Sequence, residues 1–526
     1  MFNTRLLRCG LAALFVSALA LPAAAQSFRV QCPQTTTTHP NGSSVDAAHP
    51  GLVKCQQISG GDGYATMGDG TQTYLFSFGP LSGLAKIASG QPGTDTAAEF
   101  DVVAPGLLSS ASTASPPPVP AWNGAVGLSP DPDATFTPAG STTPIACTGV
   151  NPASGTTPPG CLTGHVDPRQ IMDVGVMNGN IPAPLMAIDE DDEFFLTLTN
   201  VGMIMRPDLF EQHTVHFHGY PNASSFYDGV PDASVAINIG GSFTYYYLAP
   251  DAGTYFWHCH ITPPEHLQMG MVGQIYVRPR QNRVPTGGSL HQSLVNQQTD
   301  PRTRSDCAHD ILCTSPVPAV DNGATQKVNK LGTPMMYAYN DGDGSTAYDV
   351  EYPIQIHGFD PNFHFVGMTF NPEPFTDMKD KYFLLNGRSY PDTVAQNAMY
   401  TPVADGTNHY SQPLPAIVNI PAGGRALLRI SDLDVTEFQT LASLGIPMQV
   451  VAVNARLLRD QAGNNLYYNT NSVTLGGGES VDVILDATDT TRYPKGSVYY
   501  LYTPNLDHLS NDAENFGGLM TEVHIN

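Results

Sequence analysis

The stretch DAGTYFWHCHITPPEHLQMGMVGQIYV, residues 251–277, indicates both the fold and the chemistry of this chain. Its aromatic and β-branched runs on either side of a Pro-containing loop are typical of two β-strands. Between and beside those runs lie three histidines, one cysteine and two methionines. Thiolate, imidazole and thioether groups together form the ligand set of a blue-copper site, so the stretch predicts copper binding.

An earlier segment, HTVHFHG at residues 213–219, supplies three more histidines. Because alternate side chains of a strand point to opposite faces, His216 and His218 should share one face. His258 and His260 should do the same, while Cys259 between them points the other way. The pattern therefore predicts two metal sites, one on each side of the strand, joined by a very short covalent path.

The spacing also assigns the site on the cysteine side. His213 lies three residues before the H-x-H pair, so it can reach the opposite side of the strand end. His266 and Met271 follow the cysteine on a loop. We expect His213, Cys259 and His266 to be equatorial copper ligands and Met271 to be the weak axial one. Met269 is the alternative axial ligand, although we expect it to pack in the core.

The whole chain has the composition of an all-β protein. It contains 50 glycines and 45 prolines, only 13% of its residues are charged, and short apolar runs alternate with turn residues. This is typical of β-sandwiches. VMNGNIPAPL at residues 176–185 and LLNGRSYPDT at residues 384–393 are similar to each other, which predicts two related units.

The domain boundaries follow from changes in composition. Residues 1–25 have arginines, a short apolar run and a small-residue cleavage site, so they predict a signal peptide. We expect a first domain over 26–280, with an irregular insertion from about 92 to 168. A polar connector over 281–330 and a second domain over 331–526 should follow.

Charge and export limit the partners. The net charge is −24, with no cluster of basic residues, so nucleic acid and anionic lipid are excluded as partners. After the signal, no segment is apolar enough to cross a membrane. We therefore expect a secreted or periplasmic protein.

Six cysteines remain when Cys9 leaves with the signal and Cys259 is reserved for metal. An even number in an exported protein predicts disulfides. Proximity along the chain suggests the pairs Cys32–Cys55, Cys147–Cys161 and Cys307–Cys313.

The two histidine motifs, H-x-x-H-x-H-G and H-C-H-loop-H-x-x-x-G-M, resemble those of the multicopper oxidase and copper nitrite reductase superfamily. The resemblance also covers NGNIPAP, YDGVPDAS and FLLNGRSYPDT. It implies two cupredoxin-like Greek-key β-sandwich domains, with the type 1 copper in the first. It further implies type 2 copper at His216 and a type 3 pair held by His218, His258 and His260.

The chain departs from that family in two ways. His266 lies seven positions after Cys259 where family members have five, and we expect Pro263-Pro264 to form a bulged loop that takes up the extra length. The family's trinuclear cluster also needs eight histidines from two domains. The second domain here has five histidines and no H-x-H pair, so counting does not support an intact trinuclear cluster.

His508 has a separate resemblance. The segment around it is similar to the end of copper nitrite reductases, where one histidine crosses a trimer interface to complete a mononuclear type 2 copper. Carried over, that type 2 set would be His218, His258 and His508. However, that family has Asp in place of His216 and an Ala-like residue in place of His260.

These observations predict an exported copper oxidoreductase of multicopper oxidase type. A small-molecule or metal-ion reductant would give electrons to the type 1 copper, and a histidine-bound centre would pass them to dioxygen, with no catalytic residues beyond the metal ligands. A homotrimer would place His508 at the site. The alternatives are a nitrite-reducing enzyme and an electron-transfer or copper-storage protein.

One further segment, residues 189–193, consists entirely of Asp and Glu. Such a run before a strand is usually a solvated turn, and that is what we expect here. A metal-cation entry site is the alternative interpretation.

Overall fold

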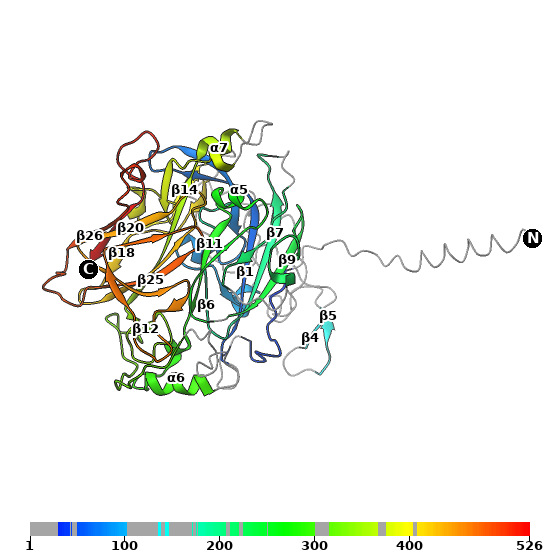
Figure 1. Cartoon of the computed structure of the whole chain (residues 1–526). Coiled ribbons are helices and arrows are strands. Elements are labelled where there is room, and N and C mark those ends of the chain that lie inside the picture. The colour runs from blue at the N-terminus through cyan, green and yellow to red at the C-terminus, as the bar shows by residue number, and fades with distance from the viewer. Residues whose placement is uncertain are drawn as a thin grey trace, which may run out of the picture.

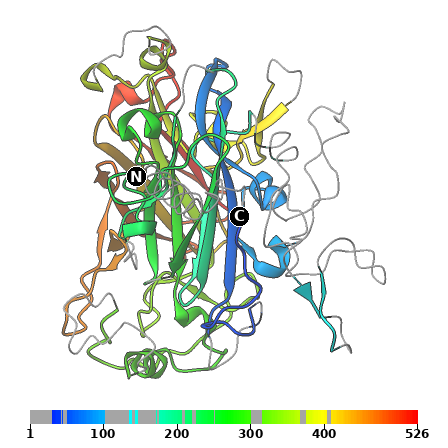
Figure 2. The ribbon, with the colours of Figure 1, turned by 90° about the vertical axis from the view of Figure 1, so that its right-hand side faces the viewer.

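A computed structural model gives the chain as two β-sandwiches lying against each other (Figure 1), and the view turned by 90° shows the same arrangement (Figure 2). The all-β prediction is confirmed. The structure describes residues 30–42, 44, 50–101, 135–137, 142–146, 171, 175, 177–206, 211–219, 225–249, 251–299, 315–366, 375–402 and 408–526.

The first sandwich consists of two sheets. One has the order β2-β1-β7-β9 with β3 beside β1, and the other has the order β6-β11-β10-β8. The strands of the first sheet are β1 (Val53–Thr66), β2 (Gln72–Pro80), β3 (Asp95–Thr96), β7 (Glu193–Gly202) and β9 (Ser242–Leu248). Those of the second are β6 (Met186–Asp189), β8 (His216–Phe217), β10 (Gly253–His258) and β11 (Val272–Arg278).

The second sandwich also has two sheets. The larger has the order β15-β14-β19-β25-β21-β22, with β23 paired to β21, and the smaller has the order β18-β27-β26-β20-β24. The strands of the larger sheet are β14 (Val350–Phe359), β15 (Tyr382–Leu385), β19 (Arg425–Asp432), β21 (Met448–Val453), β22 (Arg456–Leu457), β23 (Tyr468–Thr470) and β25 (Ser480–Asp486). Those of the smaller are β18 (Val418–Ile420), β20 (Gln439–Leu444), β24 (Ser472–Leu475), β26 (Val498–Tyr502) and β27 (Met520–Ile525).

Short two-stranded pairs and helices complete the described part. The pairs are β4 (Thr135–Phe136) with β5 (Ile145–Ala146), β12 (Met336–Tyr337) with β13 (Ala347–Tyr348), and β16 (Met399–Pro402) with β17 (Asn408–Gln412). The α-helices are α2 (Leu84–Ala88), α3 (Ala97–Phe100), α5 (Pro263–Gln268), α6 (Leu290–Thr299) and α7 (Pro361–Val366). The 3₁₀ helices are η1 (Ser225–Tyr227), η2 (Arg280–Arg283), η3 (Phe375–Asp377), η4 (Asp392–Val394) and η5 (Leu506–His508).

Alternation along β10 determines where the metal-binding residues lie. Tyr255 and Trp257 belong to the core of the first sandwich, and Cys259 follows in the same core. Thr254, on the other face, donates a hydrogen bond to Asp482 of the second sandwich (2.6 Å). His258 has the same parity as Thr254, so it lies between the two sandwiches.

Polar contacts also join the two sandwiches. Gln274 of β11 donates to Ser431 of β19 (2.7 Å). Glu351 of β14 accepts from Arg278 of the first sandwich (2.8 Å) and from Arg429 of the second (2.7 Å). A buried network of charges therefore fixes how one sandwich sits on the other.

The Cys32–Cys55 disulfide is present and ties the N-terminal segment to β1. The other two predicted pairs lie outside the described residues. In the predicted connector, residues 290–299 form helix α6, although no helix was expected there. Its buried residues Leu290 and Leu294 lie four apart on one face of that helix.

The acidic run at residues 189–193 is not a solvated turn. Glu190 and Asp192 are buried. Glu190 accepts hydrogen bonds from the backbone N–H groups of Ala252 and Arg280 (3.1 and 2.7 Å), and Asp192 accepts from that of Leu52 (2.7 Å). These carboxylates accept hydrogen bonds from backbone N–H groups that have no strand partner. The sequence of the acidic run alone does not indicate this role.

Candidate copper centres

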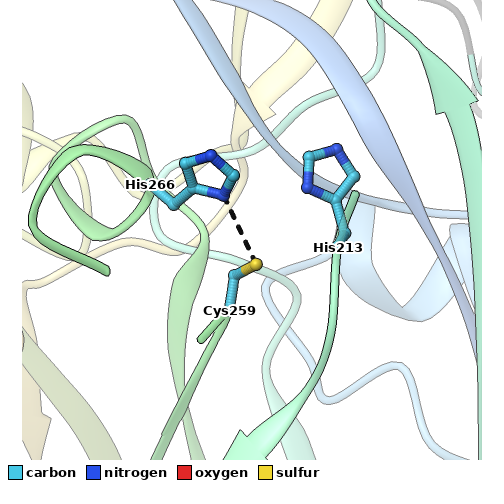
Figure 3. Close-up of side chains that lie close together, drawn as sticks. All are labelled: His213, Cys259 and His266. Carbon is cyan, nitrogen blue, oxygen red and sulfur yellow. Dashed lines mark hydrogen bonds between the residues drawn. The ribbon is translucent and has the colours of Figure 1, made fainter. Parts of the chain in front are cut away.

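Three predicted ligands meet in the core of the first sandwich. The donor atoms of His213, Cys259 and His266 all lie within 4.8 Å of one another, and all three residues are buried. Figure 3 shows the two imidazole rings on either side of the cysteine sulfur. Nδ1 of His266 lies 3.4 Å from Sγ of Cys259.

Met271 lies beside this group. It is fully buried, its backbone carbonyl accepts from the N–H of Cys259 (3.0 Å), and its N–H donates to the carbonyl of His266 (2.9 Å). Met269 belongs to the same core cluster. Its N–H bonds to Glu265 within α5, so its backbone is not paired directly with the cysteine.

Neighbouring residues fix the geometry of this group. A Cβ on Gly60 of β1 would lie 2.6 Å from Cδ2 of His213, so only glycine leaves room for that ring. The backbone N–H of Thr214 lies 3.5 Å from Sγ of Cys259, and its hydroxyl accepts from the N–H of His260 (3.0 Å). Thr214 therefore contacts both Cys259 and its neighbour His260.

The donor set fits copper. Both ring nitrogens of His213 are buried without a hydrogen-bond partner, which is costly unless something binds them. Burial lowers the pKa of His266 to about 3 and raises that of the Cys259 thiol to about 11. The imidazole is therefore neutral, and a metal ion that binds must displace the thiol proton. Two imidazoles, a thiolate and a thioether favour copper over hard cations.

A second group of histidines lies on the opposite face of the same strand end. Donor nitrogens of His216, His218 and His258 lie within 4.8 Å of one another. The ring of His260 has its centroid 5.2 Å from that of His216 and 5.5 Å from that of His258. β8 and β10 bring the four together, because His216 and His258 are directly paired in the sheet.

Hydrogen bonds orient these rings. Nδ1 of His258 donates to the carbonyl of Cys259 and Nδ1 of His216 donates to the carbonyl of Asp228, both at 2.6 Å. The Nε2 atoms of both rings are thus left as acceptors, and Nε2 of His258 lies 3.0 Å from Nε2 of His218. Burial lowers the pKa of His218 to about 4 and that of His258 to about 3. Neutral imidazoles with converging lone pairs are ready to bind a metal ion.

This second group opens into a cleft of about 520 Å³ between the two sandwiches. The first sandwich contributes three histidines and the loop after them. The second sandwich contributes carboxylates, aromatic and aliphatic side chains and a glycine turn. The cleft is lined by His218, Phe256, His258, His260, Pro263, Pro264, Leu267, Asp434, Val435, Thr436, Glu437, Phe438, Gly476 and Gly477.

Comparisons with known proteins match the segment that contains the two histidine motifs. The multicopper oxidase family model matches residues 163–282, which contain both histidine motifs. Over this segment the chain is similar to the superfamily of multicopper oxidases and copper nitrite reductases. Within it, the chain is 34% identical over 109 residues to the laccase abr2 of Aspergillus fumigatus and 35% identical over 109 residues to a copper-containing nitrite reductase of Rhizobium meliloti.

Each of these matches covers 20% of this chain, 17% of the laccase and 26% of the nitrite reductase. A solved blue copper oxidase from Nitrosomonas europaea is 20% identical, with a TM-score of 0.42, over 66% of this chain and 78% of its own. The chain therefore matches only a small part of the length of these two relatives.

His508 does not join the histidine group within one chain. It is buried in the second sandwich and stacks on Phe383, with ring centroids 3.9 Å apart. Its Nδ1 lies 3.0 Å from Oε1 of Gln439, and its Nε2 lies 2.9 Å from Nδ2 of Asn505. Both ring nitrogens already have partners in their own chain.

Two features of the site were not predicted. Oε2 of Glu211 lies 3.8 Å from Nε2 of His266, on the side of the ring that faces away from the cysteine. The carboxylates of the second sandwich that line the cleft were also missed. Glu211 is two residues before His213 and could have been noticed there, but residues 432–437 carry no motif.

The segment between Cys259 and His266 differs in structure from the loop that we expected. Pro263 and Pro264 begin helix α5, which carries His266, so they do not form a bulged loop. Proline is favoured in the first turn of a helix because its missing N–H is not needed there. The extra residues supply the helical turn that places His266 beside Cys259.

Within the described part of the chain, no helix is both long and apolar enough to span a bilayer.

Proposed function

We propose that this protein is an exported copper oxidoreductase of multicopper oxidase type. It would oxidise a reductant in one-electron steps at the cysteine-side centre and reduce dioxygen at the histidine-side centre. One observation carries the proposal. Cys259 has its thiol in the first ligand group, its carbonyl bonded to His258 of the second, and a ligand-type histidine on either side of it in sequence.

Copper held by His213, Cys259, His266 and Met271 would supply a one-electron redox couple. The residues of the chain do the rest. The core around Cys259 excludes water, α5 fixes the ring of His266, and the Nδ1–H···O=C bond of His258 joins the two ligand groups directly. A small-molecule or metal-ion reductant would approach from the Glu211 side of His266.

Dioxygen is favoured as the acceptor because four histidines of one sandwich lie together and three of them line the cleft. Copper nitrite reductases differ at two of these four positions, where they have Asp and an Ala-like residue in place of His216 and His260. A nitrite-type enzyme is the second candidate, since three converging imidazole nitrogens can hold a single copper. In that case a homotrimer would have to turn His508 of a neighbouring subunit away from its present partners.

Export belongs to the same proposal. The N-terminal 25 residues would be removed, and the protein would act in the periplasm or outside the cell. The proposed domains are 26–280 and 331–526, with a connector between them over 281–330.

The test is to load the purified protein with copper and to measure copper content, electron paramagnetic resonance and oxygen uptake with several reductants. The oxidase proposal predicts about three or more coppers per chain, a type 1 signal and oxygen uptake. About two coppers with nitrite reduction would support the second candidate. A single copper without either activity would leave an electron carrier and overturn the proposal.

The Cys259→Ser variant provides the matched control. Serine keeps the size of the side chain but removes the thiolate, so the intense visible colour and the oxygen uptake should both disappear. The fold should remain, since the residue is buried in an intact core. Oxygen uptake at the rate of the unmodified protein would show that Cys259 is not the entry point for electrons.

A further inference from the structure

The wall of the cleft that faces the histidines carries a pair of carboxyl groups from the second sandwich. Asp434, just after β19, lines the cleft and is 3% exposed. Its Oδ1 accepts from the backbone N–H groups of Thr436 (2.8 Å) and Glu437 (3.4 Å), and its Oδ2 accepts from Nε2 of Gln439 (2.7 Å). These donors suit an ionised carboxylate.

Asp380, just before β15, lies directly against it. The carboxyl groups of Asp380 and Asp434 both contact the hydroxyl of Thr436. Gly358 of β14 makes this possible, because a Cβ there would collide with both carboxyl groups. Oδ1 of Asp380 accepts from Nε2 of Gln268 in α5 (2.8 Å), which holds the pair beside the helix that carries His266.

The close approach of the two carboxyl groups favours a proton held between them. The hydroxyl of Thr436 contacts Oδ2 of Asp380 and also Oδ1 of Asp434, the latter at 2.9 Å. A hydroxyl has one hydrogen to donate, so it satisfies one carboxylate. Two adjacent carboxylates cannot both be ionised at low cost, and a shared proton removes the repulsion between them. Asp434 has the better set of donors, so the proton belongs on Asp380.

We propose that Asp380 and Asp434 form a proton-sharing pair that supplies protons to dioxygen as it is reduced in the cleft. This inference rests on the proposed oxidase function. Reduction of one dioxygen to two waters consumes four electrons, which the reductant supplies through Cys259, and four protons. Asp380 gives its proton to Asp434, Asp434 releases one into the cleft, and bulk water entering through the open side of the cleft restores it.

The electrostatic surroundings agree with this assignment. Burial raises the pKa of Asp380 well above its usual value, and the negative charge of Asp434 raises it further. Glu437 also faces the pair, and Asp432 faces Asp434. The ring of His357 lies near Asp434, but burial lowers its pKa, so it brings no positive charge at neutral pH.

His508 orients the Asp380–Asp434 pair indirectly, through Gln439. Its Nδ1–H donates to Oε1 of Gln439 (3.0 Å), which turns the amide N–H₂ of Gln439 toward Asp434. His508 is thus a positioning residue in this arrangement, acting through Gln439.

The test uses Asp380→Asn, with Asp507→Asn as the matched control. An asparagine at 380 can still donate to Asp434 but cannot release a proton, so the variant should fold normally. Asp507 is exposed and outside the pair, so its variant should behave like the unmodified protein. The first measurement is the infrared carbonyl band of a protonated carboxylic acid at neutral pH in metal-free protein. We expect Asp380→Asn to lose this band and Asp507→Asn to keep it.

The second measurement is the reoxidation of fully reduced, copper-loaded protein by dioxygen in a stopped-flow instrument. Loss of a general acid should slow this step roughly 100-fold in Asp380→Asn and increase its solvent isotope effect. Absence of the infrared band in the unmodified protein, or equal reoxidation rates in Asp380→Asn and Asp507→Asn, would overturn the proposal. If the unmodified protein takes up no oxygen, the oxidase function itself fails, and delivery to dioxygen fails with it even where the band is present.

Discussion

The two methionines after His266 differ in how firmly the backbone holds them near the cysteine. Met271 is paired with Cys259 and His266 through its carbonyl and N–H, whereas Met269 ends a helical turn. Both are buried, so burial does not distinguish them. The direct pairing with Cys259 identifies Met271 as the axial candidate.

Substitution separates the two. Met271→Leu should raise the reduction potential of the cysteine-side copper, because the axial thioether stabilises the oxidised state. Met269→Leu, the matched control, should leave the potential unchanged. Redox titration of the visible band checks both. A larger shift in Met269→Leu than in Met271→Leu would make Met269 the axial ligand.

At this scale, sequence spacing was enough to bring the ligand residues together but not to find their partners. The alternation of Cys259 with His258 and His260 follows from strand geometry, which is local. Glu211 lies near His266 only because α5 turns that ring toward it. The pairing of Asp380 with Asp434 joins residues from two distant loops, and nothing in either loop reveals the other.

Strand β1 matters to the copper site although it supplies no ligand. Gly60 and Gly61 lie at an irregularity in its pairing with β7. The two glycines face different neighbours. A Cβ on Gly60 would meet the ring of His213, and a Cβ on Gly61 would meet Cγ2 of Val201, each at 2.6 Å.

These neighbours make a matched pair of variants. Gly60→Ala and Gly61→Ala should each cost about 1–3 kcal/mol of stability, as overpacked core substitutions do. Only Gly60→Ala should displace His213 and weaken the visible colour of the copper-loaded protein. Denaturant titrations and spectra at equal copper content test this. Equal colour in the two variants would show that β1 does not set the position of His213.

The strands were more predictable than the helices. β10 and β11 were evident because their aromatic and β-branched residues alternate around a clear turn. Helices α5 and α6 were not, since α5 has only six residues and begins with two prolines, and α6 lies in a polar segment. Short helices depend on the contacts around them more than on their own periodicity.

The two sandwiches are joined by a buried charge network centred on Glu351. Burial alone would raise the pKa of Glu351, but the guanidinium groups of Arg278 and Arg429 outweigh it and lower the pKa to about 2. An acid whose pKa is lowered by folding stabilises the protein above its unfolded pKa. That contribution is lost as the pH falls from about 4.5 toward about 2.

Removing this charge tests the network. Glu351→Gln should cost about 3 kcal/mol at neutral pH, because the buried guanidinium of Arg429 and the partly buried guanidinium of Arg278 both lose this partner. The stability of the variant should also vary less with pH between about 4.5 and 2. Thermal unfolding across this range is the measurement, with exposed Glu514→Gln as the control. A pH profile for Glu351→Gln parallel to that of the unmodified protein would contradict the role assigned to the carboxylate.

On the scale of the whole molecule, two sandwiches could be inferred from the repeated NG-containing motifs, but their docking could not. Gln274, Arg278 and Thr254 contact the second sandwich through polar side chains. The sequences of their strands contain no motif that indicates such contacts. The cleft exists only once the sandwiches are in place. Its second wall therefore had no signature in the sequence.

That division of the cleft has an evolutionary consequence. Every histidine of both ligand groups comes from one sandwich, and the facing wall comes from the other. Under the proposed function, mutations around Asp434 or the glycine turn at 476–477 can thus reshape the pocket for the electron acceptor while the cysteine-side ligand group stays intact. A lineage of such an oxidoreductase could acquire a new oxidant by changing one sandwich and inheriting the other.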